Sequence, residues 1–188
     1  MSKVASQPFT DSPSSISRIS KGVRSAVNLL SRIPDSLIAL VGRFSIAAIF
    51  WKSGQTKVAG FAIDIVGGEF NLGWPRLSDS AIDLFREEYR LPFIPPEVAA
   101  PMAAFAEHFF PILILLGLAT RFSSLALLVM TLTIQIFVYP DAYPTHGVWV
   151  AVLLFLIARG PGAISLDHGL AMRFPPFSPT TDFALTKR

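Results

Sequence analysis

The stretch from Ala99 to Arg121 constrains the fold more than any other part of the chain. It is apolar for about the length of helix that crosses a bilayer, yet Glu107 and His108 lie near its middle. A carboxylate at that depth is costly unless it is paired, protonated or hydrated. The rest of the chain is therefore expected to supply a partner for Glu107.

The composition indicates a membrane protein. Of the 188 residues, 52% are hydrophobic and 15% are charged, whereas a soluble domain usually carries nearer a quarter of charged residues. The net charge of +3 comes from basic residues that flank apolar segments, which favours a lipid surface over nucleic acid as the partner. The chain has no cysteine, so it can form neither a disulfide nor a Cys-ligated cluster. No zinc-ligand spacing is present, and no metal site is expected.

Four apolar segments predict the fold class: an all-α, polytopic membrane four-helix bundle. The third span should pack antiparallel to the second, because Thr120-Arg121 leaves room only for a short turn. The first span could continue through Gly54 and Lys57. The expected spans are Asp35 to Trp51, Ala99 to Ala119, Phe122 to Tyr139 and Gly147 to Ala158.

The connection over residues 58–98 is too long for a structureless loop. Ser78 to Tyr89 is expected to form a short helix, capped by Ser78 or Asp79. Val58 to Val66 is expected to form a second short helix or a re-entrant piece that ends at Gly67-Gly68. The first loop should therefore carry short helices.

The N-terminal region has two parts. Residues 1–15 are polar and without a period, which predicts disorder. From Ile16 to Ile33 apolar residues fall on one helical face, with Arg18, Lys21 and Arg24 largely off it. That pattern predicts a basic amphipathic helix in the headgroup layer. A transit peptide and a solvated tail remain alternatives.

The distribution of Lys and Arg predicts that both termini are cytoplasmic. The domain organisation expected is an N-terminal cytoplasmic tail over 1–34, a transmembrane domain over 35–162 and a cytoplasmic tail over 163–188. One side of the membrane would carry ten basic residues and the other side five. The ten are Lys3, Arg18, Lys21, Arg24, Arg32, Arg121, Arg159, Arg173, Lys187 and Arg188; the five are Lys52, Lys57, Arg76, Arg86 and Arg90.

Arg43 is the base expected to pair with Glu107. At about 1.5 Å per residue, their levels differ by about 6 Å in a hydrocarbon core about 30 Å thick. Lys57 or Lys52 is the alternative cation. The pair could be a clamp that fixes helix register, or it could handle protons or contact a quinone.

His108 is expected to be a hydrogen-bonded core histidine. A bis-His haem needs two histidines at similar depth on facing helices, and the other two, His146 and His168, lie at opposite edges of the expected bundle. Gln135 is expected to form a hydrogen bond across helices.

Five pieces of the sequence carry a family resemblance: Arg43, Gly54-x-x-Lys57, Glu107, the turn Gly117 to Arg121, and Gly160-Pro161-Gly162-x-x-Ser165-Leu166-Asp167. In these pieces and their order the chain resembles the DoxX family of small four-helix membrane proteins, over about residues 38–170. The resemblance implies a bacterial or archaeal inner-membrane protein. Some relatives are a subunit of a thiosulfate:quinone oxidoreductase, and others are linked to membrane complexes that handle thiol and superoxide stress.

Two functions follow as hypotheses. The first is a membrane subunit of a redox complex that binds quinone or a redox partner protein. The second is a non-enzymatic scaffold or small transporter. Whether the chain is an enzyme, and whether it pairs with further copies of itself, both stay open. The binding cluster expected is Arg43, Lys57, Glu107, His108 and Gln135, and the structural motif is Gly54, Gly117, Arg121 and Asp167.

Overall fold

The computed structural model describes residues 15–64 and 67–174. Residues 1–15, for which disorder is expected, lie almost entirely outside this part. The Pro-rich end of the chain, residues 175–188, also lies outside it. The chain divides into two units, Met1–Pro34 and Asp35–Arg188, and each is described by itself.

The first unit contains helix α1, Ser15–Leu30. Val23, Val27 and Leu30 are exposed and are spaced four and three residues apart, so they share one face of the helix. The helix predicted from Ile16 onward is therefore confirmed, while its place at a membrane surface stays a prediction.

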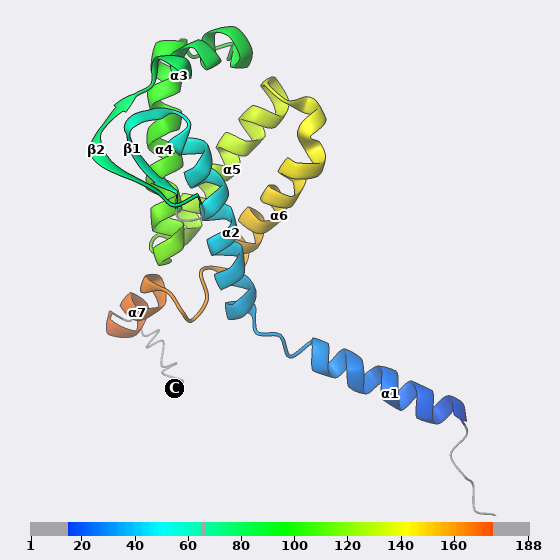
Figure 1. Cartoon of the computed structure of the whole chain (residues 1–188). Helices are drawn as coiled ribbons and strands as arrows, with labels where there is room; N and C mark the ends of the chain where they lie inside the picture. The colour runs from blue at the N-terminus through cyan, green and yellow to red at the C-terminus, as the bar shows by residue number, and fades with distance from the viewer. Residues whose placement is uncertain (1–14, 65–66, 175–188) are drawn as a thin grey trace, which may run out of the picture. The chain divides into compact units, whose positions relative to one another are not determined.

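The second unit is built on four long helices that are apolar enough to cross a membrane (Figure 1). This arrangement is consistent with the membrane helical bundle expected. The helices are α2 (Asp35–Gln55), α4 (Pro96–Leu116), α5 (Thr120–Phe137) and α6 (Tyr143–Arg159), with the short 3-10 turn η2 (Pro140–Ala142) leading into α6 and helix α7 (Leu166–Arg173) following it.

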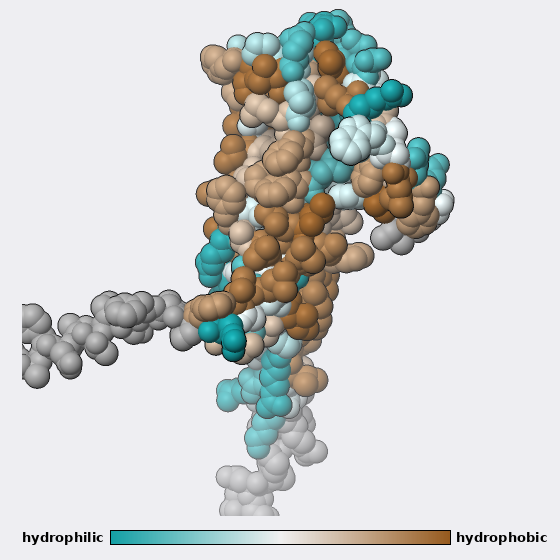
Figure 2. Space-filling model, turned by 90° about the vertical axis from the view of Figure 1, so that its left-hand side faces the viewer, coloured by the Kyte–Doolittle hydropathy of each residue, from teal (hydrophilic) through white to brown (hydrophobic). Residues whose placement is uncertain are grey.

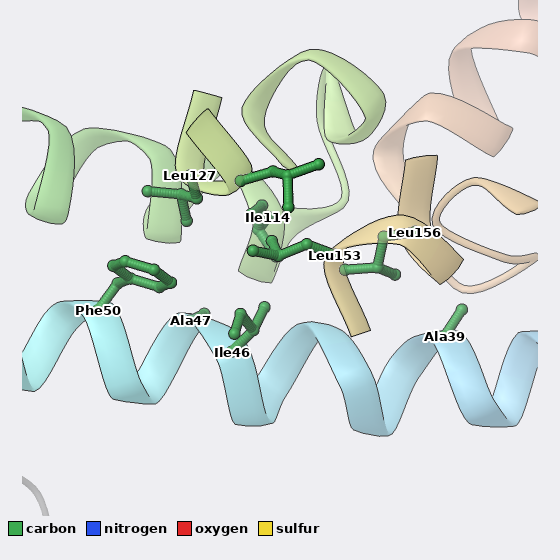
Figure 3. Packing of buried hydrophobic residues seen from close by; sticks show 9 residues of the cluster. Ala39, Ile46, Ala47, Phe50, Ile114, Leu127, Leu153 and Leu156 are labelled. Atoms are coloured by element: carbon green, nitrogen blue, oxygen red, sulfur yellow. The ribbon is translucent and has the colours of Figure 1, made fainter. Parts of the chain in front are cut away.

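The four helices meet in one apolar core. Ile46 and Phe50 of α2 face the other three helices, and Ala47 lies between them (Figure 3). Outward-facing side chains are also apolar: on the face drawn in Figure 2 they cover the middle of the bundle, and hydrophilic residues gather above it. Such a surface suits hydrocarbon as its solvent. The core residues opposite α2 are Ile114, Leu127, Leu128, Leu153 and Leu156.

The first loop departs from the prediction. Instead of a short helix or re-entrant piece over Val58 to Val66, the structure has an antiparallel hairpin of β1 (Val58–Asp64) and β2 (Glu69–Leu77). The fold is therefore not all-α. The hairpin forms because Phe61 and Ile63 alternate with smaller or polar residues, and Gly67-Gly68 allows the reversal, with Gly68 at φ +73°.

Two short helical elements follow the hairpin. They are α3 (Asp79–Asp83) and the single π-helical turn η1 (Leu84–Tyr89). Phe85 of η1 packs against Ala99 and Ala100 of α4. We call this end of the bundle, where α2 ends and α4 begins, the hairpin end, and the opposite end, with the α4–α5 turn, the turn end.

Candidate functional site

A buried ion pair between Lys57 and Glu107 lies at the centre of the site. The Lys57 ammonium is 2.8 Å from Glu107 Oε2, and both side chains are 3% exposed. Lys57 belongs to the turn that ends α2, where its N–H donates to Gly54 O at 2.9 Å, while Glu107 lies midway along α4. Because both groups are desolvated, removal of either one would leave the other buried without its partner.

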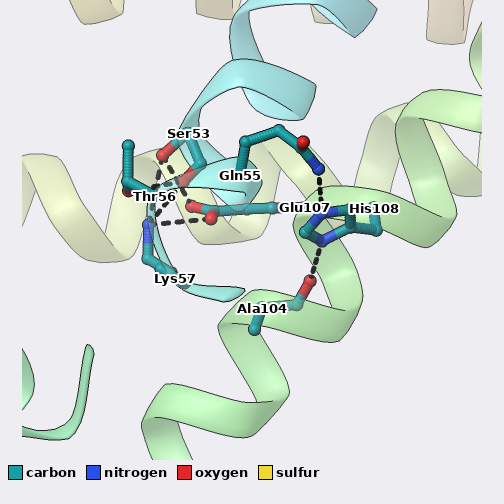
Figure 4. Close-up of polar contacts among 7 residues, drawn as sticks. All are labelled: Ser53, Gln55, Thr56, Lys57, Ala104, Glu107 and His108. Atoms are coloured by element: carbon teal, nitrogen blue, oxygen red, sulfur yellow. Dashed lines mark hydrogen bonds and ion pairs between the residues drawn. The ribbon is translucent and has the colours of Figure 1, made fainter. Parts of the chain in front are cut away.

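Ser53 joins the pair into a network (Figure 4). Its hydroxyl donates to Glu107 Oε1 at 3.1 Å. Lys57 Nζ in turn lies 3.2 Å from Ser53 Oγ and 3.3 Å from Ser53 O. Ser53 and Lys57 are four residues apart, so the last turn of α2 presents both to the same point of α4.

His108 lies beside this network and is held in one tautomer. Its Nδ1 is 2.7 Å from Ala104 O, which only accepts, so Nδ1 carries the proton. Its Nε2 is 2.8 Å from Gln55 Nε2, which donates, because Gln55 Oε1 accepts the Ile63 N–H at 2.7 Å. Both ring nitrogens therefore have hydrogen-bond partners, which is consistent with the hydrogen-bonded histidine that was expected.

Gly54 allows α2 to approach this part of α4. A Cβ at position 54 would lie 2.8 Å from the His108 ring and 3.1 Å from Glu107 Cβ. Any larger residue would separate Lys57 from Glu107, so the Gly54-x-x-Lys57 spacing serves the ion pair directly.

Arg43 does not meet Glu107, and the predicted Arg43–Glu107 pair is wrong. The side chain is buried, but it points to the turn end, where the carbonyls of the last turn of α4 can accept hydrogen bonds from outside the helix. Its guanidinium ties that helix end to the segment after α6. It donates to the carbonyls of Ile114 (2.8 Å), Leu115 (2.6 Å), Pro161 (3.0 Å) and Ile164 (2.5 Å).

Asp167 and Gly117 complete the connections at the turn end. The Asp167 carboxylate accepts the N–H of Ala119 at 2.8 Å and of Thr120 at 3.0 Å, which caps the start of α5. Gly117 ends α4 at φ +69°, and a Cβ there would lie 2.5 Å from Ser165 Cβ and 2.9 Å from the Arg43 guanidinium carbon. These residues of the expected motif therefore lie where the helices are joined.

Arg121 joins α5 to α6 at the same end. Its Nη1 donates to Ile157 O at 2.5 Å and to Ala158 O at 3.1 Å, the last turn of α6. It therefore satisfies carbonyls that the end of a helix leaves open.

Gln135 forms the cross-helix hydrogen bond that was predicted. Its Oε1 is 2.7 Å from His146 Nδ1 of α6, and its Nε2 donates to Pro140 O at 2.6 Å. It is thus separate from the Lys57–Glu107 network. Within the described residues, no three or more His, Asp or Glu side chains lie together as metal ligands would.

An apolar cavity of about 220 Å³ lies between α4, α5 and η1 and reaches Glu107. Among the described residues that line it, Glu107 alone is charged. Ala99, Ala103 and Ala106 of α4 supply the space, because their small side chains leave the gap between the helices unfilled. Met102 of α4 and Val129 of α5 also line it and are 56% and 58% exposed, so the cavity opens toward the lipid-facing surface.

Tyr89 of η1 lines the same cavity. Burial, and next the negative charge of Glu107, raise the pKa of the Tyr89 phenol above its usual range. The phenol therefore stays protonated at neutral pH and can donate a hydrogen bond. A further contact joins η1 to the end of α5: the Tyr139 hydroxyl donates to Glu88.

Sequence reasoning missed the cavity, Ser53, Gln55 and Tyr89. A signal was present for Ser53, because it lies one helical turn before Lys57. The cavity had no such signal. The three alanines of α4 follow a helical spacing that is typical of close helix contact, and whether they leave a cavity depends on the side chains of the facing helix.

The fold and the site define a class: a four-span helical membrane protein with a buried Lys–Glu pair beside an apolar cavity. Comparison with known proteins gives the particular family. The profile of the DoxX family matches residues 38–140, and the chain belongs to that family. An uncharacterised protein of Haemophilus influenzae is 29% identical over 100 residues, which are 48% of this chain and 66% of that relative. No solved structure matches the chain.

Proposed function

We propose that this chain is a bacterial inner-membrane subunit of a redox complex and that it binds the head group of a quinone in the cavity beside Glu107. Both termini would face the cytoplasm. The observation that carries the proposal is an apolar cavity, open toward lipid, that ends at a buried charged network.

The size of the cavity supports a small ring as the ligand. An apolar cavity of about 150 Å³ is enough to hold benzene, and this one measures about 220 Å³. A substituted quinone ring is only modestly larger than benzene. Its isoprenoid tail would leave between α4 and α5, past Met102 and Val129, into the bilayer.

The polar groups fit the two states of a quinone. A quinone carbonyl accepts hydrogen bonds, and Tyr89 offers a protonated phenol on the cavity wall. Reduction to the quinol takes up two electrons and two protons. Glu107 would accept a hydrogen bond from the quinol. The two electrons would come from a redox partner protein, because the chain has no cysteine to donate them, and the two protons would come from water.

The test is to purify the chain in mild detergent and extract its lipids. The proposal predicts quinone at a constant ratio to protein in the wild type and a loss of it in Glu107→Gln. Co-purifying proteins would identify the partner, and reduction of added quinone by thiosulfate in that preparation would identify the reaction. Protein that carries no quinone and binds none would contradict the proposal.

One observation favours the second candidate, a non-enzymatic scaffold or small transporter. Both Glu107 oxygens already contact Lys57 or Ser53, as in a clamp that only holds α2 against α4. In that case Glu107→Gln would lower stability and leave the amount of bound quinone, or its absence, unchanged.

A further inference from the structure

The β1–β2 hairpin has one apolar face and one polar face. Residues directly opposite each other in an antiparallel pair point to the same side of the sheet. Phe61 lies opposite Leu72 and Ile63 lies opposite Phe70, which gives the apolar face. Ala62 lies opposite Asn71 and Asp64 lies opposite Glu69, which gives the more polar face.

The hairpin folds back over the end of α2. β1 starts only three residues after α2 ends, yet Ile63 is bound to the last turn of that helix. The Trp51 indole donates to Ile63 O at 3.0 Å, and the Ile63 N–H donates to Gln55 Oε1 at 2.7 Å. The two strands therefore run back along the bundle, as Figure 1 shows, rather than away from it.

Only half of the apolar face is covered by the protein. On the β1 side, Phe61 packs edge-on against Trp51, with ring centroids 6.3 Å apart. On the β2 side, Phe70 and Leu72 are 65% and 77% exposed, and Trp74 is 90% exposed. Among the described residues, no neighbour buries these three large apolar side chains of β2.

A bulge interrupts the sheet beside Trp74. Regular pairing is interrupted between Ala59 and Phe61, and Gly60 has φ +81°. A Cβ on Gly60 would lie 2.7 Å from Trp74 O, so only glycine allows the two strands to cross this closely.

The surroundings of β2 indicate that lipid covers its exposed apolar side chains. The strand lies beside α4, whose side chains at the hairpin end include the exposed Val98, Met102 and Phe105. The uncovered half of the sheet is therefore continuous with the lipid-facing surface of the bundle. Tryptophan is enriched where a bilayer meets water, and a strand with an open edge is not stable deeper in hydrocarbon.

We infer that the hairpin is a membrane-interface anchor: Phe70, Leu72 and Trp74 lie in the boundary between headgroups and acyl chains at the hairpin end, with Asn71 on the opposite face toward water. The anchor would hold the first loop against the sides of α2 and α4 at the edge of the bilayer. This inference is independent of the quinone proposal.

The absence of cysteine from the chain makes a direct test practical. Leu72→Cys places a single nitroxide label on the apolar face, and Asn71→Cys places the matched label one residue away on the other face. Both positions are exposed, so neither change removes core packing. The full chain is reconstituted in liposomes, and collisions of each label with oxygen and with a water-soluble nickel chelate are measured.

We expect the label at 72 to favour collisions with oxygen and the label at 71 to favour the nickel chelate. Equal access of both labels to the nickel chelate would overturn the inference, because the face would then be in water. Dipolar broadening at 72 that disappears when labelled protein is diluted with unlabelled protein would overturn it as well, since a second copy would then cover the face.

Discussion

Arg43 and Lys57 show how two buried cations in one helical region take different partners. Arg43 carries a fork of five donors, and it lies at the level where α4 ends and carbonyls are open. Lys57 carries a compact ammonium, and it lies beside the Glu107 carboxylate. The guanidinium therefore joins backbone segments, whereas the ammonium neutralises one charge.

The Lys57–Glu107 pair predicts strong coupling in a double-mutant cycle. Lys57→Met or Glu107→Gln alone leaves a buried charge unpaired, which costs about 3–5 kcal/mol in soluble proteins and less where water or snorkelling relieves it. The double variant should recover part of that loss. Melting temperature in detergent is the measurement.

Arg43→Gln supplies the control for that cycle. Because Arg43 and Glu107 do not touch, their combined effect should be additive. Coupling between Arg43 and Glu107, with none between Lys57 and Glu107, would show that the ion pair is assigned wrongly.

Sequence reasoning found the charged residues of the site but not their pairing. Their depth could be estimated from helix length, and Glu107 and Lys57 were both recognised as cluster members. The choice between Arg43 and Lys57 depended on the turn after Gln55, which brings Lys57 back over α4, and on carbonyls that Arg43 reaches across the bundle. Contacts of that range leave no periodic signal in the sequence.

At the scale of elements, the four spans were predictable and the hairpin was not. Long apolar runs can be only helices in a bilayer. Val58 to Val66 is short, and its apolar residues suit a strand or a helix until their partners are known. The partners of Ile63 are the side chains of Trp51 and Gln55, which decide its path.

Asp167 caps the start of α5, and the contribution of this cap to stability can be measured. Asp167→Ala removes the acceptor for the N–H groups of Ala119 and Thr120, and we expect a loss of about 1–2 kcal/mol. Asp167→Asn keeps one acceptor oxygen and should lose less. Thermal unfolding of the two variants compares them; equal losses would mean that the charge of Asp167, not its acceptor geometry, matters.

Helix α1 predicts reversible binding to anionic membranes. A peptide of residues 15–33 should gain helicity on anionic vesicles and lose it at high salt, because its basic residues are attracted to the headgroups. Circular dichroism follows the change. Equal helicity on neutral vesicles would exclude the electrostatic part of the binding, and removal of the segment from the mature protein would favour a transit peptide.

At the scale of the whole molecule, the Lys and Arg distribution predicts cytoplasmic termini. Because the number of candidate spans is even, the two ends of the four-helix bundle would lie on the same side of the membrane. Reporter fusions after Arg188 and after Arg90 should give opposite signals, with the C-terminal one cytoplasmic. A periplasmic signal from the C-terminal fusion would reverse the topology.

The central claim is that the cavity beside Glu107 binds a quinone. The most direct test compares the binding of a short-chain quinone to the purified wild type and to a variant whose cavity is filled by a larger side chain. Ala106→Phe places a large ring in the cavity, while Ala151→Phe adds the same ring to an exposed position of α6. The wild type and Ala151→Phe should bind the quinone with similar affinity, and Ala106→Phe should bind it much more weakly at an unchanged melting temperature. Equal binding by all three proteins would show that the quinone site is not this cavity.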